Sequence, residues 1–396
     1  MRIKNCIPAL IAATLLFGAP ALAETTVKVG VINTYSGPLA ATGDGIQRGI
    51  DLYIKLHPNE LPAGVTIELI KRDDTGVNPE VAKRLAQELI THDKVQILTG
   101  VVWTPNALSI APLATEAKVP FVIMNAGTAM ITTKSPYIAR VSFTMWESNY
   151  PLGTWAAKSG LKNVFTLVSD YGPGIDAESA FSKAFTDGGG TIAGSVRMPV
   201  TTPDFVPFLQ RAKDAKPDAV FCFVPASKQA TAFMKAFGDL GLTAAGVKLI
   251  GPGDITPDEE LPGMGDVALG TITMHHYSSA LDTPENKAFV AAYKAAYGAD
   301  AEPGFEAVDA YDGMAAIYAV VKAQNGNIDP DKTMELLKGW KDASPRGPIS
   351  IDPETRDIVQ NEYLRRVDKV NGQLQNTVIE TTPAVKDPWK EINKAK

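Results

Sequence analysis

The chain has 396 residues, of which 38 are Lys or Arg and 44 are Asp or Glu, giving a net charge of −6 at pH 7. This length exceeds the ~250–300 residues at which one hydrophobic core usually divides, so two domains are expected. Because the charge is acidic and Lys and Arg are not clustered, nucleic acid and anionic membrane surfaces are excluded as expected partners.

The first 23 residues have the three-part pattern of a cleavable secretory signal. Arg2 and Lys4 precede an apolar run at 7–17, and Ala21-Leu22-Ala23 supplies the small residues of a cleavage site. The run is shorter than the ~20 residues that span a bilayer, which disfavours a membrane anchor. We expect cleavage after Ala23 and release into the periplasm, with a mature charge of −8 because two basic residues are lost.

Cys222 is the only cysteine of the expected mature chain, because Cys6 lies in the signal and too early to carry a lipid. A lone thiol between Phe221 and Phe223 is typical of a small core residue. No intramolecular disulfide is therefore expected.

From residue 27, short apolar runs alternate with amphipathic stretches, which is typical of parallel strands joined by helices. Strands are predicted at 27–32, 65–70, 95–99 and 120–123, and helices at 44–56, from 79 and at 104–118. Asn78 and Pro79 mark a helix start, as a cap and a first helical residue. This pattern predicts an α/β sheet with helices on both faces.

A second set of similar plan begins after Arg140. Helices are predicted at 150–158, 174–185, 204–213, 227–240, from 283 and at 305–322, and strands at 164–168, 191–196, 219–223 and 247–250. Further on, alternating strands are expected, with Asn371-Gly372 as a two-residue hairpin turn. Residues 383–396 are not placed. The expected fold class is α/β with two similar doubly wound lobes.

Three loops at the ends of predicted strands are candidate ligand sites, because open α/β sheets bind ligands there, beside helix N-termini. In residues 100–105, the Thr104 hydroxyl either binds a carboxylate or caps its own helix, and the sequence favours neither. Residues 125–128 are small and leave backbone amides accessible. Residues 33–44 are typical of a turn, with a ligand-facing rim as the alternative.

Enzyme motifs are missing from the sequence, which has neither a G-x-S-x-G elbow nor a Walker loop. Gly43, Gly45 and Gly49 are spaced one residue too widely for dinucleotide binding, so no cofactor is expected. A secreted hydrolase is the enzyme alternative, disfavoured because nucleophile and metal motifs are missing.

Adjacent His275 and His276 would point to opposite faces of a strand, which favours a structural role over a metal site. The acidic groups at 73–74 and 258–260 are typical of solvated loops rather than acid–base pairs.

Several segments together resemble the leucine/isoleucine/valine-binding class of type I periplasmic binding proteins. They are Tyr35-Ser36-Gly37-Pro38 with Gly43-Asp44, Asp73-Asp74, Asp170-Tyr171-Gly172-Pro173-Gly174, Tyr311-Asp312-Gly313-Met314 and Arg346-Gly347-Pro348-Ile349. Each segment is weak alone, but their order and spacing are distinctive, and the resemblance extends from residue 27 to about 378.

The resemblance implies two lobes with parallel-rich sheets, joined by a hinge that the chain crosses three times, near Phe143, His275 and Ile349. Lobe one would hold residues 24–143 and 276–347. Lobe two would hold residues 144–275 and 348–396.

The resemblance also implies a ligand site between the lobes. Thr104 and the group Ala126-Gly127-Thr128 would hold the ligand carboxylate, the latter if one residue is inserted before it. Tyr171 would close from the other lobe. Trp103 and Phe305 would contact the ligand side chain.

This sequence departs from the family pattern at three positions. Gly253 stands where relatives bind the α-ammonium group, and Asp254 beside it is the candidate substitute. Ala226 stands where relatives have a second tyrosine, and Thr42 replaces an aromatic residue, which would enlarge the pocket. An α-keto or aromatic acid without an ammonium group therefore stays open beside an amino acid.

The expected function is capture of an amino acid or related small carboxylate by lobe closure, without catalysis, metal or cofactor. The resemblance implies a monomer that delivers its solute to an ABC permease in the inner membrane. The alternative is a soluble sensor of the same fold that presents its ligand to a signalling partner.

Overall fold

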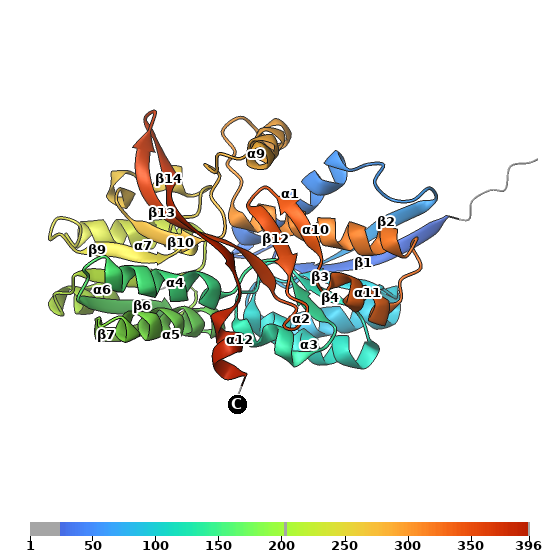
Figure 1. Ribbon diagram of the computed structural model, residues 1–396, viewed down its shortest axis with the longest axis horizontal. Coiled ribbons are helices and arrows are strands. Elements are labelled where there is room, and N and C mark those ends of the chain that lie inside the picture. Colours follow the sequence, from blue (N-terminus) through green and yellow to red (C-terminus); the bar gives the residue numbers. More distant parts are fainter. Residues whose placement is uncertain (1–23, 202–203, 395–396) are drawn as a thin grey trace, which may run out of the picture.

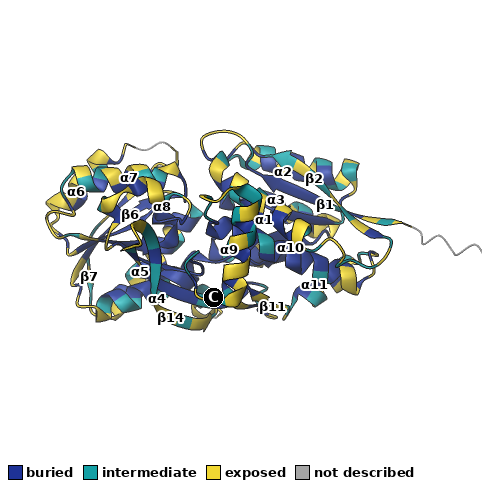
Figure 2. Ribbon diagram, turned by 90° about the horizontal axis from the view of Figure 1, so that it is seen from above, coloured by how far each residue is buried: buried dark blue, intermediate teal, exposed yellow. Residues whose placement is uncertain are grey.

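The computed structural model describes residues 24–201 and 204–394, and the expected signal sequence, residues 1–23, lies outside them. Two β-sheets flanked by helices lie side by side (Figure 1), which confirms the predicted α/β class. Figure 2 shows buried residues along the strands and exposed residues on the outer helix faces. Among the described residues, no helix combines the length and the apolar character needed to span a membrane.

The first sheet is parallel throughout, in the order β2-β1-β3-β4-β5. Its strands are β1 (Thr25–Asn33), β2 (Val65–Asp73), β3 (Ile97–Gly100), β4 (Phe121–Ile123) and β5 (Ile138–Arg140). The helices of this half are α1 (Ala40–Leu56), α2 (Pro79–Glu88), the π-helical η1 (Leu89–Asp93), α3 (Thr104–Ala117), the 3-10 helix η2 (Ala129–Lys134), α10 (Phe305–Ala323) and α11 (Pro330–Leu337).

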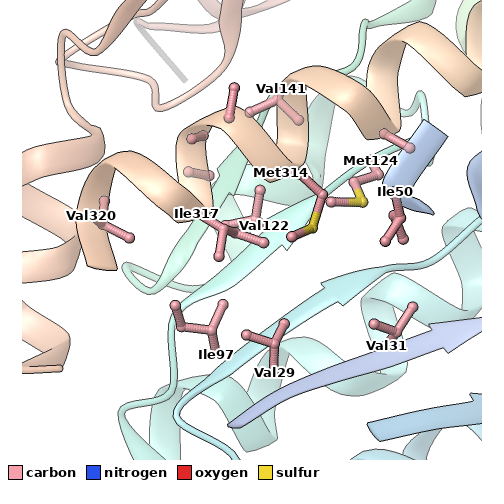
Figure 3. Packing of buried hydrophobic residues seen from close by; sticks show 14 of the residues in the cluster. Val29, Val31, Ile50, Ile97, Val122, Met124, Val141, Met314, Ile317 and Val320 are labelled. Carbon is pink, nitrogen blue, oxygen red and sulfur yellow. The ribbon is translucent and has the colours of Figure 1, made fainter. Parts of the chain in front are cut away.

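Side chains that alternate along these strands form two cores, one on each face of the first sheet. Val29 and Val31 belong to the core beneath α1 and α10, where Met314 and Ile317 lie above them (Figure 3). Ile32 belongs to the opposite core, beneath α2 and α3. The sheet is therefore covered on both faces, as a doubly wound fold requires.

The second sheet has the order β11-β12-β13-β10-β9-β8-β6-β7, with β14 paired to β13. Its strands are β6 (Asn163–Ser169), β7 (Thr191–Met198), β8 (Ala219–Phe223), β9 (Lys248–Pro252), β10 (Ile272–His275), β11 (Lys341–Ser344), β12 (Gly347–Ile351), β13 (Ile358–Val370) and β14 (Gln373–Val385). Strands β6 to β10 pair in parallel, and β11 to β14 are antiparallel additions.

Helices cover both faces of the second sheet as well. The helical elements of this half are α4 (Met145–Lys158), α5 (Gly172–Asp187), α6 (Val206–Asp214), α7 (Lys228–Asp239), η3 (Gly253–Ile255), α8 (Leu261–Met264), η4 (Asp266–Ala268) and α12 (Pro388–Asn393). Helix α9 (Pro284–Tyr297) lies against α1 of the first half, where the Tyr297 hydroxyl donates to the Arg48 carbonyl over 2.8 Å. Along β8, Phe221 and Phe223 pack toward α4 and α5, whereas Cys222 packs toward α6 and α7. The prediction that Cys222 is a core residue is confirmed, since its side chain is fully buried.

Local signals in the sequence account for several element ends. Asn78 caps α2, accepting a hydrogen bond of 3.3 Å from the Val81 amide, and Pro79 is the first helical residue. The turn between β13 and β14 is Asn371-Gly372, with φ angles of 51° and 84°, which suit a type I′ hairpin. The stretch 383–396, which the sequence left unplaced, contains the end of β14 and all of α12.

The chain passes between the two halves more than once (Figure 1). It enters the second sheet after β5, returns after β10 to place α10 on the first sheet, and crosses again through β12 and β13. Each half is therefore built from segments that are far apart in the sequence.

Arg346 joins these crossings, and its side chain is almost completely buried. Its guanidinium pairs with Asp309 (Nη1 to Oδ1, 2.7 Å) and Asp312 (Nε to Oδ2, 2.8 Å), both on α10. It also donates to the carbonyl oxygens of Val141 and Ser142, which follow β5, and to Gln360 of β13. One cation thus fixes the crossing segments relative to one another.

Replacing the guanidinium by an uncharged side chain in Arg346→Met should lower the free energy of unfolding by about 3–5 kcal/mol, because two buried acids lose their counter-ion. Urea unfolding followed by tryptophan fluorescence measures this loss. Arg366→Met is the control, since Arg366 is half exposed and pairs with Asp368, and should cost under about 1 kcal/mol. Similar small losses for both variants would contradict the role given to Arg346.

Candidate functional site

A small cavity lies between the two halves, where strand ends from both sheets face each other. Its volume is about 20 Å³, enough for about one water molecule. The residues that line it are Thr42, Val102, Trp103, Asn125, Gly127, Phe143, Met145, Tyr171, Pro173, Phe223, Pro225, Ala226, Asp254, Phe305 and Glu306. An organic ligand therefore fits only if the surrounding side chains or the two halves move apart.

Most of the side chains predicted from the sequence meet at this cavity. Thr42, Trp103, Tyr171, Asp254 and Phe305 line it. They come from α1, the loops after β3, β6 and β9, and the start of α10. Ligands of open α/β sheets bind at the carboxyl ends of parallel strands, and such strand ends of both sheets border this cavity.

Thr104 and Thr128 form a hydroxyl pair beside the cavity, with their Oγ1 atoms 2.9 Å apart. Helix α3 begins at Thr104 itself, so the preceding residue is the cap, and no side chain caps this helix. The interpretation of Thr104 as a helix cap is therefore wrong. Both threonines are buried, and each hydroxyl can turn to donate a hydrogen bond toward a ligand.

The second half meets this hydroxyl pair at Gly172, the first residue of α5. A Cβ atom at Gly172 would lie 2.6 Å from Thr128 Oγ1 and 3.1 Å from Thr104 Cγ2. Contacts this short require glycine. Thr42 makes a second link between the halves, since its hydroxyl donates to the Ala226 carbonyl over 3.0 Å.

Arg140 sets the direction of the peptide groups in the loop that follows β4. Its Nη1 donates to the carbonyl oxygens of Ala126 (2.8 Å) and Thr128 (2.9 Å). Because the peptide group is planar and trans, the Gly127 amide points away from Arg140. Ala126 is fully buried and does not line the cavity, whereas Gly127 does. The loop therefore presents an N–H group with a buried cation behind it, and this cation also pairs with Asp357.

Trp103 is held by a chain of hydrogen bonds that ends on a buried acid. Its indole N–H donates to Thr34 Oγ1 (2.8 Å), and the Thr34 hydroxyl donates to Asp74 Oδ1 (2.7 Å). Asn106 donates to the other oxygen of Asp74 (2.8 Å). Burial raises the pKa of the Asp74 carboxyl. The chain fixes the indole ring against the cavity.

Two acids that the sequence analysis assigned to solvated loops are buried, so that prediction is wrong for them. Asp74 is fully buried in the hydrogen-bonded chain that holds Trp103. Asp258 is also buried, and accepts hydrogen bonds of 3.1 Å from Ser279 and from Asn376. Hydrophilic composition did not reveal that these loops fold back onto the protein.

Five aromatic residues line the cavity, and four of them pack in pairs. Phe143 and Phe305 pack edge to face with centroids 5.5 Å apart, and Tyr171 lies 6.0 Å from Phe223. Trp103 completes the set. Rings in such arrangements favour an aromatic or apolar guest, because the edge of one ring carries the opposite partial charge to the face of another.

Two carboxyl groups line the cavity, and each has one oxygen without a partner in the described part of the chain. Asp254 and Glu306 are 4% and 1% exposed, and Asp254 Oδ2 and Glu306 Oε1 accept no hydrogen bond within the described part of the chain. Burial raises the pKa of Asp254 to about 7, with Arg365 opposing the shift. Burial also raises the pKa of Glu306 well above its usual value. Both groups therefore tend toward the neutral form.

His275 and His276 lie behind the aromatic wall and support it. The His276 ring stacks on Phe143 with centroids 5.1 Å apart, and its Nε2 lies 2.9 Å from Asp309 Oδ1. The His275 ring packs edge to face on Phe305 at 4.5 Å. Burial lowers the pKa of both imidazoles, so they are neutral. Residues 24–201 and 204–394 contain no cluster of three or more side chains suited to a metal ion.

Several lining residues were not among the sequence candidates, including Phe143, Met145, Phe223 and Glu306, whereas Asn125 belongs to the predicted loop at 125–128. Phe223 ends β8, so the strand-end rule applied to every strand would have found it. Glu306 directly follows a candidate, Phe305. No feature of the sequence predicted that Met145 lines the cavity, because its position there depends on how the two halves pack.

The comparisons with known proteins agree with this architecture. Residues 26–373 match the family described as periplasmic binding protein. Leu/Ile/Val-binding protein homolog 6 of Brucella suis biovar 1 is 45% identical over 377 residues, which is 95% of this chain and 96% of that protein. The chain belongs to the periplasmic binding protein family. The members of this family that it matches are non-enzymatic solute-binding components of ABC transporters.

Two solved structures are still more similar. A solute-binding protein of an ABC transporter from Rhodopseudomonas palustris BisB5, in complex with 3,4-dihydroxybenzoic acid, is 52% identical, with a TM-score of 0.89 over 92% of this chain and 99% of that one. A second from R. palustris, in complex with 4-hydroxybenzoate, is 47% identical with the same TM-score and coverage. The fold is therefore the type I fold of these proteins.

Substituting Ala for Gly172 should push the two halves apart at the site, because the new Cβ atom cannot fit against Thr128 and Thr104. Small-angle scattering should show a larger radius of gyration than for the unchanged protein. Gly263→Ala is the control, since a Cβ atom there meets no neighbour within 4 Å. An unchanged radius for Gly172→Ala would show that the contact does not limit the approach of the halves.

Proposed function

We propose that this protein captures an aromatic carboxylate of the benzoate class and delivers it to an ABC permease. The observation that carries the proposal is the wall of aromatic side chains around the cavity, next to a hydroxyl pair and an amide backed by a buried arginine. The relatives crystallised with 3,4-dihydroxybenzoic acid and 4-hydroxybenzoate support it.

The carboxylate would bind where Thr104, Thr128 and Gly127 come together. The two hydroxyls and the Gly127 amide are hydrogen-bond donors, and the N-terminus of α3 adds a favourable dipole. Arg140 lies behind the same loop, where its charge also favours an anion. A neutral solute would gain little from this arrangement.

A branched-chain amino acid is the second candidate, favoured by the name of the Brucella relative. It needs an acceptor for its ammonium group close to its carboxylate. Gly253 stands at the family position for that acceptor, and Ala226 replaces a tyrosine. Burial raises the pKa of Asp254 to about 7, so binding an ammonium group there at neutral pH would include the cost of ionising a buried carboxyl. We therefore favour the aromatic acid.

In the proposed mechanism, the two lobes, residues 24–143 with 276–347 and residues 144–275 with 348–396, close on the ligand about the hinge. Tyr171 comes from lobe two, and Trp103 and the hydroxyl pair come from lobe one. Contacts with both lobes favour the closed form, which the permease would recognise. Family membership implies a periplasmic location, and we propose export by the signal at residues 1–23 and action as a monomer.

A thermal-shift screen tests the ligand class, because a ligand that binds only the folded protein raises its melting temperature. Benzoate, 4-hydroxybenzoate and 3,4-dihydroxybenzoate should each raise Tm by several degrees at 1 mM, and leucine, isoleucine and valine should not. Stabilisation by the amino acids alone would overturn the proposal. The comparisons offer no observation that favours the sensor alternative.

Thr104→Ala removes one hydroxyl of the carboxylate subsite and should weaken benzoate binding by about 1–3 kcal/mol, a loss that calorimetry can measure. Thr115→Ala is the matched control, because Thr115 lies at the far end of the same helix and its hydroxyl bonds to the Ala111 carbonyl. Equal affinities for the two variants would remove Thr104 from the site.

A further inference from the structure

The lining of the cavity has more hydrogen-bonding groups than a ligand with one carboxylate and an unsubstituted ring can pair with. Asp254 and Glu306 both line it, both are more than nine-tenths buried, and each has an oxygen without a hydrogen-bond partner in the part of the chain that the structure describes. A buried polar atom that stays unsatisfied destabilises a protein. A polar ligand atom in the cavity would complete them.

The two carboxyls line the same cavity and come from different elements. Asp254 belongs to η3, after β9, and Glu306 to the first turn of α10. Tyr171 lines the cavity beside them. When Asp254 is ionised, its charge raises the pKa of Glu306 and of Tyr171. The two carboxyl groups are called the Asp254–Glu306 subsite from here on.

From this geometry we infer that the Asp254–Glu306 subsite binds a hydroxyl group on the ring of the captured aromatic acid, so that the protein selects hydroxybenzoates over benzoate. This inference rests on the proposed function and adds the recognition of a ring substituent to it.

The chemistry of both partners fits this assignment. A neutral carboxyl group donates one hydrogen bond and accepts others, and a phenolic hydroxyl group does the same. Burial favours the neutral form of both acids. The phenol therefore satisfies the two carboxyls without bringing a charge into the cavity. Benzoate, by contrast, would bury both carboxyls against its ring and leave them unpaired.

An ammonium group is the competing occupant of the subsite, and the surroundings argue against it. Arg365 is the cation whose charge acts on Asp254, and its guanidinium lies close behind, since a Cβ atom at Gly253 would be 2.4 Å from Arg365 Nη2. A second cation bound next to Asp254 would be repelled by Arg365. A neutral hydroxyl group meets no such repulsion.

Calorimetric titration of the unchanged protein with a short series of ligands tests the inference without any variant. We expect 4-hydroxybenzoate or 3-hydroxybenzoate to bind at least tenfold more tightly than benzoate. The shape control is 4-methylbenzoate, which fills a similar volume without a hydrogen bond and should not exceed benzoate. A site built for a hydroxyl group rejects the analogue that lacks it.

Variants test whether the two acids cause the preference for hydroxybenzoates over benzoate. Asp254→Leu and Glu306→Met should each lower at least tenfold the ratio of the affinity for the preferred hydroxybenzoate to the affinity for benzoate. Asp254→Asn keeps hydrogen-bonding capacity and should retain part of the preference. Glu285→Met is the matched control, an exposed acid in the first turn of α9. If the Leu variant fails to fold, the Asn and Met variants carry the test.

The outcomes separate this inference from the proposed function. Equal affinities for benzoate and both hydroxybenzoates would overturn the hydroxyl subsite and leave the proposed function standing. Failure of every aromatic acid, with binding of an amino acid, would overturn both. A hydroxybenzoate preference that survives Asp254→Leu and Glu306→Met would overturn the assignment to these residues.

Discussion

The arrangement of the two halves depends on one buried guanidinium. Arg346 binds two acids of α10, two carbonyl groups after β5 and a side chain of β13, so the segments that pass between the sheets converge on it. Its rigid fork of donors satisfies all these acceptors at once, which a lysine could not do. Residues that line the cavity lie beside these crossings, and Phe143 immediately follows the carbonyls that Arg346 holds.

The cations around the cavity, like Arg346, are bound by groups of the protein itself. The cations Arg140, Arg346 and Arg365 are buried behind the lining residues and bind protein groups, so none of them faces a ligand directly. The groups that reach the cavity are hydroxyls, an amide, two buried carboxyls with raised pKa values and aromatic rings. Under the proposed function, such a surface would bind an anion by hydrogen bonds rather than by an ion pair, and would distinguish ligands by shape and by the position of their polar atoms.

Strong local patterns made much of this structure predictable. The apolar run of β8, the Asn78 cap and the Asn371-Gly372 turn each act within a few residues, and each was predicted. The end of β14 and α12 was not, because its polar sequence is ordered by contacts with distant parts of the chain: Lys390 Nζ donates to the Ala129 carbonyl over 2.6 Å. That Thr128 meets the Thr104 hydroxyl was expected only from the family resemblance, because local patterns do not reach across a strand crossover.

Strand β13 is made by residues 358–370, near the end of the chain, yet it pairs with β10 on one side and β12 on the other. The ribosome must therefore finish almost the whole polypeptide before the second sheet can be completed. Until then the edge of β10 stays open, and such long-range pairing forms slowly.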